Sequence, residues 1–463
     1  MLFNSPLFIF AFLPVTFAVY FWLNHKRLSE AAKGWLVLSS LFFYSWWNPI
    51  YLPLILGSML FNFWLGARLA RGASLLWLVA GVAVNLSALG YFKYADFFIA
   101  NANLVFGVEW DTLNLVLPLA ISFFTFQQIA FLVDSYRREM RELNFLNYAV
   151  FVSFFPQLIA GPIVHHREMM PQFASLRAKV IHYPRLAAGL VIFSTGLFKK
   201  VVIADSFAPW ANAGFDGGQA LGFLEAWVTS LAYTFQLYFD FSGYSDMAIG
   251  LALLFNIRLP FNFNSPYRAL SIQDFWRRWH MTLSRFLRDY LYVPLGGNRK
   301  GSFRTYGNLM VTFVLGGLWH GAAWTFVFWG FLHGLALACH RAWQSAGIAM
   351  PRVLAWLLTF LFVNAAWVFF RAEQWSDATR ILSGMAGFAG WRQNGLSPEF
   401  PVDASILVGL IAGFVICLAL SNMNRVRDAR VRWTQTVLAA LMFAAAVITS
   451  AKTSSEVFLY FNF

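Results

Sequence analysis

The sequence predicts an all-α protein that crosses a membrane many times. Of its 463 residues, 59% are hydrophobic and only 12% are charged, whereas a soluble domain carries about 25% charged residues. Several apolar runs approach or exceed about 18 residues, the length that indicates a membrane-spanning helix. Short basic loops separate these runs, as the positive-inside rule describes for cytoplasmic loops. We therefore expect one integrated membrane domain over residues 1–463.

The net charge of +13 does not indicate a nucleic-acid-binding protein, because the basic residues lie in loops between apolar runs. The two cysteines, Cys339 and Cys417, lie in separate apolar segments and form no disulfide or metal-binding pattern. The N-terminus lacks a basic region and a small-residue cleavage site. We expect the first apolar run to be a retained helix, and not a cleaved signal.

The first third of the chain is predicted to form apolar spans separated by basic loops. Asn48 and Pro49 are a helix stop after the second span. The fifth run contains Pro118, Gln127 and Gln128, so it should be broken or line the interior. The predicted spans here are Leu7–Leu23, Trp35–Trp47, Tyr51–Leu65, Leu75–Phe92 and Leu113–Val133.

The basic loops predict the orientation of the chain. All of them fit on one cytoplasmic face, which places the N-terminus outside. The last span, Trp433–Ala451, then leaves the C-terminus outside as well, and the polar insertion Arg371–Asp403 falls on the outer side. The loops used are Lys26–Lys33, Arg68–Arg71, Arg137–Arg141 and Arg425–Arg432.

The middle of the chain departs from plain apolar helices. Phe154–His166 holds two prolines and a glycine, which argues against a regular helix. Lys199 and Lys200 lie inside one apolar segment, where they could extend toward the interface or meet an anionic donor. Asp240 and Asp246 lie inside another, and we expect them to pair with basic residues of the FWRRWHMTLSRF segment.

The stretch Ser271–Gly301 is amphipathic, basic and aromatic. Such a pattern predicts a helix that lies at the cytoplasmic interface of the membrane. Its arginines Arg277, Arg278, Arg285 and Arg288 suit anionic headgroups, and its tryptophans suit the interfacial belt.

The run Val311–Gly334 is almost wholly apolar and is long enough to cross a bilayer. It contains His320, beside Trp319 and between Gly317 and Gly321. Ionisable groups at membrane depth usually face a cavity or pathway, and a histidine can accept the proton of an attacking hydroxyl. The glycines would let a substrate or a backbone approach closely. His320 is therefore a candidate general base, and the alternative is a neutral histidine that hydrogen-bonds between helices.

Two further histidines need an interpretation. On an unbroken helix, His333 lies about 220° around the axis from His320, so we expect it to be structural unless the helix breaks. We place such a break near Gly330. His280, beside Trp279, is either an interfacial histidine or a second active-site group.

Three kinds of catalytic motif are missing from the sequence. It contains no GxSxG elbow, no Walker-type loop and no cluster with zinc-ligand spacing. These absences favour direct transfer with a histidine base over a covalent serine mechanism.

The sequence resembles the membrane-bound O-acyltransferases, in particular the bacterial branch of the alginate O-acetylation membrane protein and the D-alanine transfer protein of teichoic acids. The resemblance runs through most of the chain, and its motifs occur in order. They include MLFNSPLFIFAFLPV, LFFYSWWNP, FFPQLIAGPI, LFKKVVIAD, YFDFSGYSDMAIG, FWRRWHMTLSRFLRDYLYVPLGGNR, GGLWHGAAWTFVFWGFLHG and VFLYFNF.

This resemblance implies a fold and a site. The fold is a ring of about eleven transmembrane helices, with short re-entrant and interfacial helices around a central tunnel. His320 matches the essential histidine of the family inside the membrane, and His280 matches the second histidine, on the cytoplasmic side. The residues of the same motifs that we expect to bind substrate or support the site are Trp319, Asp240, Tyr238, Arg277, Arg278, Gly317 and Gly321.

The resemblance also implies a function in the bacterial inner membrane. The protein would move an acetyl group from a cytoplasmic thioester, such as acetyl-CoA, for O-acetylation of an exported polysaccharide such as alginate or cellulose. No bound cofactor or metal is implied, whereas a periplasmic acetyltransferase of the SGNH serine-hydrolase type and the polysaccharide machinery are implied partners.

Two alternatives stay open. One is a transporter or flippase for a glycan or lipid-linked intermediate, since broken helices and buried charges suit transporters, although no internal repeat is visible. The other is a non-catalytic scaffold of a secretion complex.

Overall fold

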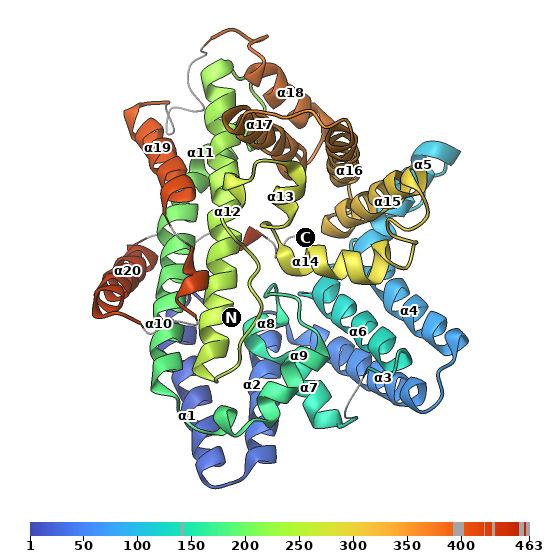
Figure 1. The fold of residues 1–463 in the computed structure, drawn as a ribbon, viewed down its shortest axis with the longest axis vertical. Helices are drawn as coiled ribbons and strands as arrows, with labels where there is room; N and C mark the ends of the chain where they lie inside the picture. The colour runs from blue at the N-terminus through green and yellow to red at the C-terminus, as the bar shows by residue number, and fades with distance from the viewer. Residues whose placement is uncertain (140–142, 392–401, 421, 428–430, 453–457, 460–463) are drawn as a thin grey trace.

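The computed structural model describes residues 1–139, 143–391, 402–420, 422–427, 431–452 and 458–459. Every regular element within these residues is helical (Figure 1), which confirms the predicted all-α class. Parts of three predicted features, the Arg371–Asp403 insertion, the Arg425–Arg432 loop and the C-terminal SSEVFLYFNF, lie outside the described residues.

The N-terminal spans occur close to where the sequence predicts them. The fourth helix continues beyond Phe92, because a π turn joins α4 to α5 in one helical run. α6 begins after Pro118, as expected for a broken apolar segment. The elements are η1 (Phe8–Phe12), α1 (Leu13–His25), α2 (Ser29–Ser45), η2 (Pro49–Tyr51), α3 (Leu52–Arg71), α4 (Leu75–Leu89), η3 (Gly90–Tyr94), α5 (Ala95–Phe106) and α6 (Ile121–Tyr136).

The middle of the chain combines short helices with the longest one. The FFPQLIAGPIVHH segment forms a single helical turn followed by a turn and irregular chain, as its prolines predict. The elements are α7 (Phe145–Ser153), α8 (Phe155–Leu158), α9 (His166–Ala174), η4 (Leu176–Lys179), α10 (Tyr183–Phe198), η5 (Lys199–Ala204), α11 (Asp205–Asp216) and α12 (Phe223–Leu254).

The C-terminal third contains a broken hairpin and the last spans. Its elements are η6 (Pro266–Arg268), α13 (Ile272–Trp276), α14 (Met281–Leu287), η7 (Arg288–Tyr292), α15 (Ser302–His320), α16 (Trp324–Ser345), α17 (Arg352–Arg371), α18 (Trp375–Met385), α19 (Ala404–Ala419), η8 (Met423–Arg425) and α20 (Trp433–Lys452).

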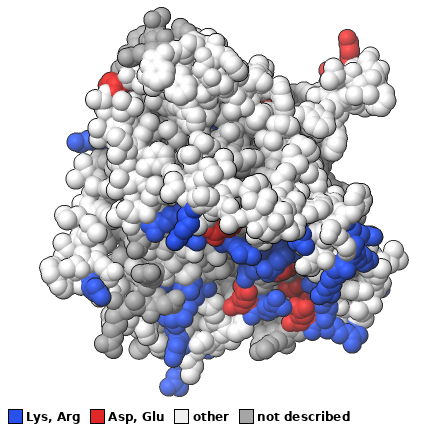
Figure 2. All heavy atoms as spheres, turned by 45° about the horizontal axis from the view of Figure 1, so that its top comes forward, with Lys and Arg blue, Asp and Glu red and all other residues white. Residues whose placement is uncertain are grey.

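Six helical runs among the described residues are long and apolar enough to cross a membrane. The predicted total of about eleven stays a prediction. In Figure 2, lysine and arginine side chains gather in the lower half of the visible face, while most of its upper half is uncharged. The six runs are Phe8–His25, Pro49–Arg71, Leu75–Phe106, Tyr183–Asp216, Arg352–Arg371 and Trp433–Lys452.

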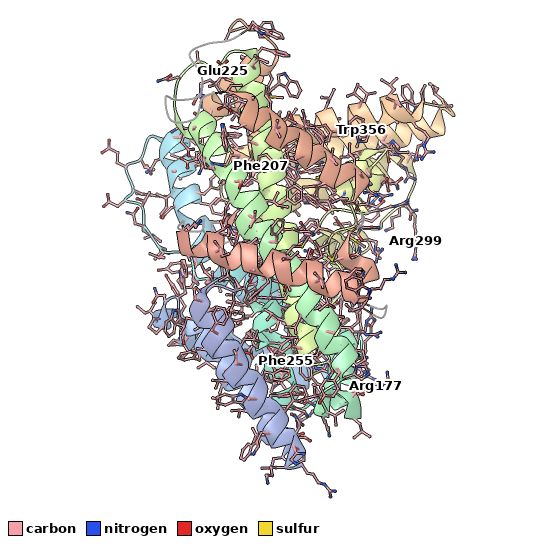
Figure 3. The ribbon with its side chains drawn as sticks, turned by 90° about the vertical axis from the view of Figure 1, so that its left-hand side faces the viewer. Arg177, Phe207, Glu225, Phe255, Arg299 and Trp356 are labelled. Atoms are coloured by element: carbon pink, nitrogen blue, oxygen red, sulfur yellow. The ribbon has the colours of Figure 1, made fainter. Side chains whose placement is uncertain are left out.

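The helices α10 and α12 run side by side along the long axis of the molecule (Figure 1). A Cβ atom built on Gly196 would lie 2.6 Å from the Gly243 carbonyl oxygen, and one built on Gly250 would lie 2.6 Å from that of Gly189. Small residues of this kind let helix backbones touch inside a membrane. Figure 3 shows α12 extending from Glu225 near the top to Phe255 below, with α20 lying across α10.

This close contact corrects the predicted partners of the buried aspartates. Lys199 Nζ lies 2.6 Å from Asp246 Oδ2, and Lys200 Nζ lies 3.1 Å from Asp240 Oδ1. Lys200 also lies 2.6 Å from Asp205 Oδ1. The expected pairing with the FWRRWHMTLSRF segment is therefore wrong. Because the glycines bring η5 directly against α12, the aspartates meet the two lysines of η5.

The Val311–Gly334 run forms a hairpin, and the predicted break near Gly330 is wrong. The chain leaves α15 at Gly321, and α16 begins at Trp324. Gly330 instead lies within α16, where a Cβ atom would meet the Phe313 carbonyl oxygen at 2.3 Å. Its small size therefore serves the close packing of α15 on α16.

The prediction of one interfacial helix over Ser271–Gly301 is also wrong. α13 ends at Trp276, and α14 starts after His280, whose φ of 43° and ψ of 52° are left-handed. A residue in this conformation cannot continue a right-handed helix. His280 and Trp279 are buried, so this part of the segment packs inside the protein.

We predict that Lys200→Met destabilises the protein strongly. The substitution removes the cation that Asp205 and Asp240 share, and loss of one partner of a buried ion pair costs about 3–5 kcal/mol. The change in unfolding free energy can be measured on purified protein in detergent. As a control, Arg288→Met removes a mostly exposed pair with Asp289 and should cost less than about 1 kcal/mol. Equal effects of the two substitutions would contradict the prediction.

We also predict opposite effects for alanine at two glycines of α15. A Cβ atom at Gly317 would lie 2.2 Å from the Phe326 carbonyl oxygen, whereas one at Gly307 would meet nothing within 4 Å. Gly317→Ala should therefore cost about 1–3 kcal/mol through overpacking. Gly307→Ala should be neutral or stabilise by up to about 1 kcal/mol, because alanine favours a helix. Thermal unfolding of both variants tests this contrast. An unfolding temperature of Gly317→Ala equal to that of the wild type would refute it.

Candidate active site

His320 is the last residue of α15, and only 2% of its surface is exposed. The next residue, Gly321, is extended, so the chain turns away from the helix axis at this point. A Cβ atom on Gly321 would lie 2.2 Å from the ring of Phe326. Both predicted glycines, Gly317 and Gly321, therefore allow α16 to pack closely beside the histidine.

Aromatic rings surround the imidazole of His320. The ring centroids of Trp319, Trp329 and Phe370 lie 5.0, 5.2 and 5.1 Å from that of His320, all in edge-on arrangements. Trp319 is itself stacked on Phe126 at 5.0 Å. Packing of this kind restricts the rotation of the imidazole.

The structure brings His280 and His320 together, with ring centroids 6.4 Å apart. This places the two predicted histidines in one buried site, although 40 residues separate them in the chain. His280 reaches this position through the left-handed turn between α13 and α14. A non-glycine residue held in that conformation is strained, and such strain is often found at functional sites.

A hydrogen-bond network assigns the tautomer of His280. The Asn262 side-chain oxygen accepts from the backbone N–H of Thr282 at 3.3 Å and from its hydroxyl at 2.9 Å. That atom is an acceptor, so the Nδ1 of His280, 3.1 Å away, must donate to it. The neutral imidazole of His280 then presents a lone pair on Nε2. Asn262 was not singled out in the sequence, and only its polar character within an apolar region could have indicated it.

His333 is fully buried and accepts a hydrogen bond from Trp276 Nε1 at 3.1 Å. Its ring lies 4.7 Å from Trp329, the same tryptophan that contacts His320. Because the helix does break after His320, the condition on which His333 was expected to be structural does not hold. The break brings the His333 ring near the site, where Trp276 donates a hydrogen bond to it.

Two further predicted site residues, Tyr238 and Asp240, lie on α12. Tyr238 is buried on α12 and packs 6.3 Å from Trp279, the neighbour of His280. Asp240 is held by Lys200 and by the backbone N–H of Leu459, at 2.9 Å from Oδ2.

The two predicted arginines lie nearer the surface. Arg277 is exposed, and Arg278, which follows α13, pairs with Asp274 of that helix at 2.9 Å. Of these two, Arg277 is the one whose position suits contact with an anionic group outside the protein.

Two residues that the sequence analysis did not single out contact the end of α15. Lys93 and Tyr94, from the π turn η3, donate hydrogen bonds to carbonyl oxygens of this helix. Lys93 interrupts a long apolar run, as Lys199 and Lys200 do, and that feature could have identified it.

A cavity of about 610 Å³ lies next to the histidine site. The 321–323 turn and Phe370 form part of its wall, and Phe370 also contacts the ring of His320. Tyr233 and Gln236 line it from α12, and both are at least 96% buried. Their hydroxyl and side-chain carbonyl oxygens have no hydrogen-bond partner among the described residues. The other lining residues are Tyr91, Phe92, Lys93, Ala95, Asp96, Leu115, Leu117, Asn212, Phe326, Arg371, Ala372, Glu373 and Leu459.

The side chains around His280 and His320 suit proton transfer more than they suit metal binding or nucleophilic attack. Two imidazoles lie close together among aromatic rings, beside a cavity with polar groups. A buried imidazole can accept a proton from a hydroxyl that reaches it through the cavity.

Comparison with known proteins identifies the family of the chain. The sequence model of the MBOAT, membrane-bound O-acyltransferase family matches residues 133–373, which include both histidines. The chain is 49% identical to the peptidoglycan O-acetyltransferase of Helicobacter pylori, over its whole length and 98% of that protein. It is 42% identical to the probable alginate O-acetylase of Azotobacter vinelandii, over 90% of this chain and 84% of that protein. Identity to the teichoic acid D-alanyltransferase of Bacillus subtilis is 28%, over 54% of this chain and 67% of that protein. The chain thus belongs to the membrane-bound O-acyltransferase family and is a multi-pass membrane enzyme that transfers acyl groups to hydroxyl groups.

Proposed function

We propose that this enzyme moves acetyl groups from a cytoplasmic thioester, such as acetyl-CoA, across the bacterial inner membrane for O-acetylation of an exported polysaccharide. The observation that carries the proposal is the buried pair of His280 and His320, 6.4 Å apart, beside a polar cavity. Membership of a family of acyltransferases supports transfer over the transporter and scaffold alternatives.

In the proposed reaction, His320 acts as the general base. It takes the proton of the acceptor hydroxyl while the hydroxyl oxygen attacks the thioester carbonyl carbon. The carbon–sulfur bond then breaks, and the thiolate leaves with the proton that His320 received. The products are an acetyl ester and a free thiol, so atoms and charge balance without a further reactant.

His280 has a different proposed role. Because its Nδ1 donates to Asn262, its neutral Nε2 is an acceptor and cannot donate to an oxyanion. This favours a role in orienting the donor, for example through an amide N–H of the thioester arm. Arg277, exposed in the same segment, is placed to attract the phosphates of a coenzyme donor.

The acceptor is proposed to approach through the cavity of about 610 Å³. The cavity is lined by Arg371 and Glu373, at the start of the insertion that the basic-loop count assigns to the outer face. The donor would then enter from the opposite, cytoplasmic face.

The similarity to the relatives favours peptidoglycan as the polymer to test first. The peptidoglycan O-acetyltransferase relative covers the whole chain at 49% identity, while the alginate relatives share 38–44%. A separate periplasmic SGNH-type acetyltransferase would complete the transfer to the polymer.

We predict that His320→Ala lowers O-acetylation of the polymer at least about 100-fold, which is typical for loss of a general base. Acetate released by mild base from purified peptidoglycan and from secreted polysaccharide measures the effect and identifies the polymer. The variant must reach the membrane at the wild-type level. His25→Ala, an exposed histidine at the end of α1, is the control and should keep full activity. Full acetylation by His320→Ala would exclude the proposed mechanism.

Substitutions in the cavity should weaken acceptor binding. Tyr233→Phe and Gln236→Leu each remove one hydrogen-bonding group, which is worth about 0.5–1.5 kcal/mol. Each should therefore raise the KM for the acceptor about 2- to 12-fold, with the KM for the thioester unchanged. Ser242→Ala removes a buried α12 hydroxyl that does not line the cavity and serves as the matched control. An unchanged acceptor KM in both cavity variants would argue against acceptor binding there.

A further inference from the structure

The C-terminal end of α15 lies inside the protein, where its carbonyl groups need partners. The last four carbonyls of any α-helix have no partner within the helix itself, and a buried carbonyl without one is costly. The chain turns away at Gly321, whose N–H bonds the Gly317 carbonyl at 3.4 Å. The three carbonyls that follow, including that of His320, must find partners elsewhere.

Those partners come from η3, more than 200 residues earlier in the chain. Tyr94 donates its hydroxyl hydrogen to the Leu318 carbonyl at 2.7 Å. Lys93 Nζ donates to the carbonyls of Trp319 and His320, at 2.6 and 3.2 Å. These three bonds complete the capping of the helix, and a cation at a helix C-terminus is also favoured by the helix dipole.

The third hydrogen of the Lys93 ammonium group points to α6. It bonds the hydroxyl of Ser122 at 3.2 Å, and Ser122 is buried. An ammonium group has three N–H donors, so these three acceptors use all of them. Although Lys93 borders the cavity, its donors are directed at the helix end and not at a ligand.

The π turn gives Lys93 and Tyr94 this position. A π turn inserts one extra residue into a helix and commonly marks functional sites. Here it joins α4 to α5 within a run that is otherwise α-helical. Two consecutive side chains thereby reach three consecutive carbonyls of α15.

We propose that Lys93 and Tyr94 are positioning residues that hold the catalytic imidazole of His320 in its reactive place by capping the end of its helix. This rests on the proposed role of His320 as the base. Helix ends fray when they are not capped, and His320 is the last helical residue. A misplacement of about 1 Å in an active site can cost about 100-fold in rate.

The test compares Lys93→Met and Tyr94→Phe with the wild-type enzyme in detergent. Acetyl-CoA is the donor, a peptidoglycan oligosaccharide with the SGNH-type partner is the acceptor system, and release of the free thiol is the readout. Lys93→Met should lower kcat about 100-fold, and Tyr94→Phe, which removes one of the three bonds, should lower it less. The KM for acetyl-CoA should stay within about twofold, since neither residue contacts substrate in this proposal. Rates are taken per folded protein, and Tyr94→Phe keeps the test valid if Lys93→Met fails to fold.

Lys33→Met is the matched control. Lys33 is also a partly buried lysine, bonded to Glu30 and Asn147 at 2.8 Å each, but it joins α2 to α7 and should leave kcat unchanged. In the His320→Ala background, Lys93→Met should cause no further loss, because it acts through His320.

Three results would overturn the proposal. They are a wild-type kcat for folded Lys93→Met, a raised KM for acetyl-CoA with an unchanged kcat in that variant, and a further loss of rate when Lys93→Met is added to His320→Ala. A fully active His320→Ala enzyme would instead refute the proposed function, so the two failures can be told apart.

Discussion

A helix that ends inside a membrane protein must have its last carbonyl groups bonded by side chains, and this constraint shapes the site. α15 stops at His320, and Lys93 and Tyr94 supply the missing donors. The same ending lets the chain turn back at once, so that α16 packs on α15. The catalytic candidate is thus held at a fixed helix end, while the turn beside it borders a cavity.

The structure also depends on the close contact between α10 and α12, which glycines on both helices allow. This contact brings η5 against α12, so that the charged side chains near it pair with one another. Lys199 pairs with Asp246, and Lys200 pairs with Asp205 and Asp240. Charges at such depth are costly unless they are paired. With these charges neutralised by one another, the two histidines lie in a separate, aromatic environment where a neutral imidazole can act as a base.

The sequence predicts the helical class and the first spans well, because apolar length is a local feature. It also singles out His280 and His320, ionisable residues in apolar segments, and the structure brings these two together. The sequence does not predict contacts that depend on the packing of distant segments. The aspartates pair with η5 because Gly196 meets Gly243, and no local pattern reveals that contact. The position of the hairpin break also depends on packing. The break falls at Gly321, whereas Gly330 lies within α16 and packs against the backbone of α15. Asn262 was missed because its hydrogen bonds form only once the site is assembled, whereas Lys93 was missed although it interrupts a long apolar run.

The central claim is that acyl transfer connects a donor on one face of the membrane to an acceptor on the other. Proteoliposomes with the SGNH-type partner and an oligosaccharide of the acceptor polymer trapped inside, and radiolabelled acetyl-CoA added outside, test it directly. We expect label to appear on the trapped acceptor, in a manner that depends on His320, while the labelled thioester itself stays outside. Label found only on acceptor added to the same side as the donor would contradict it.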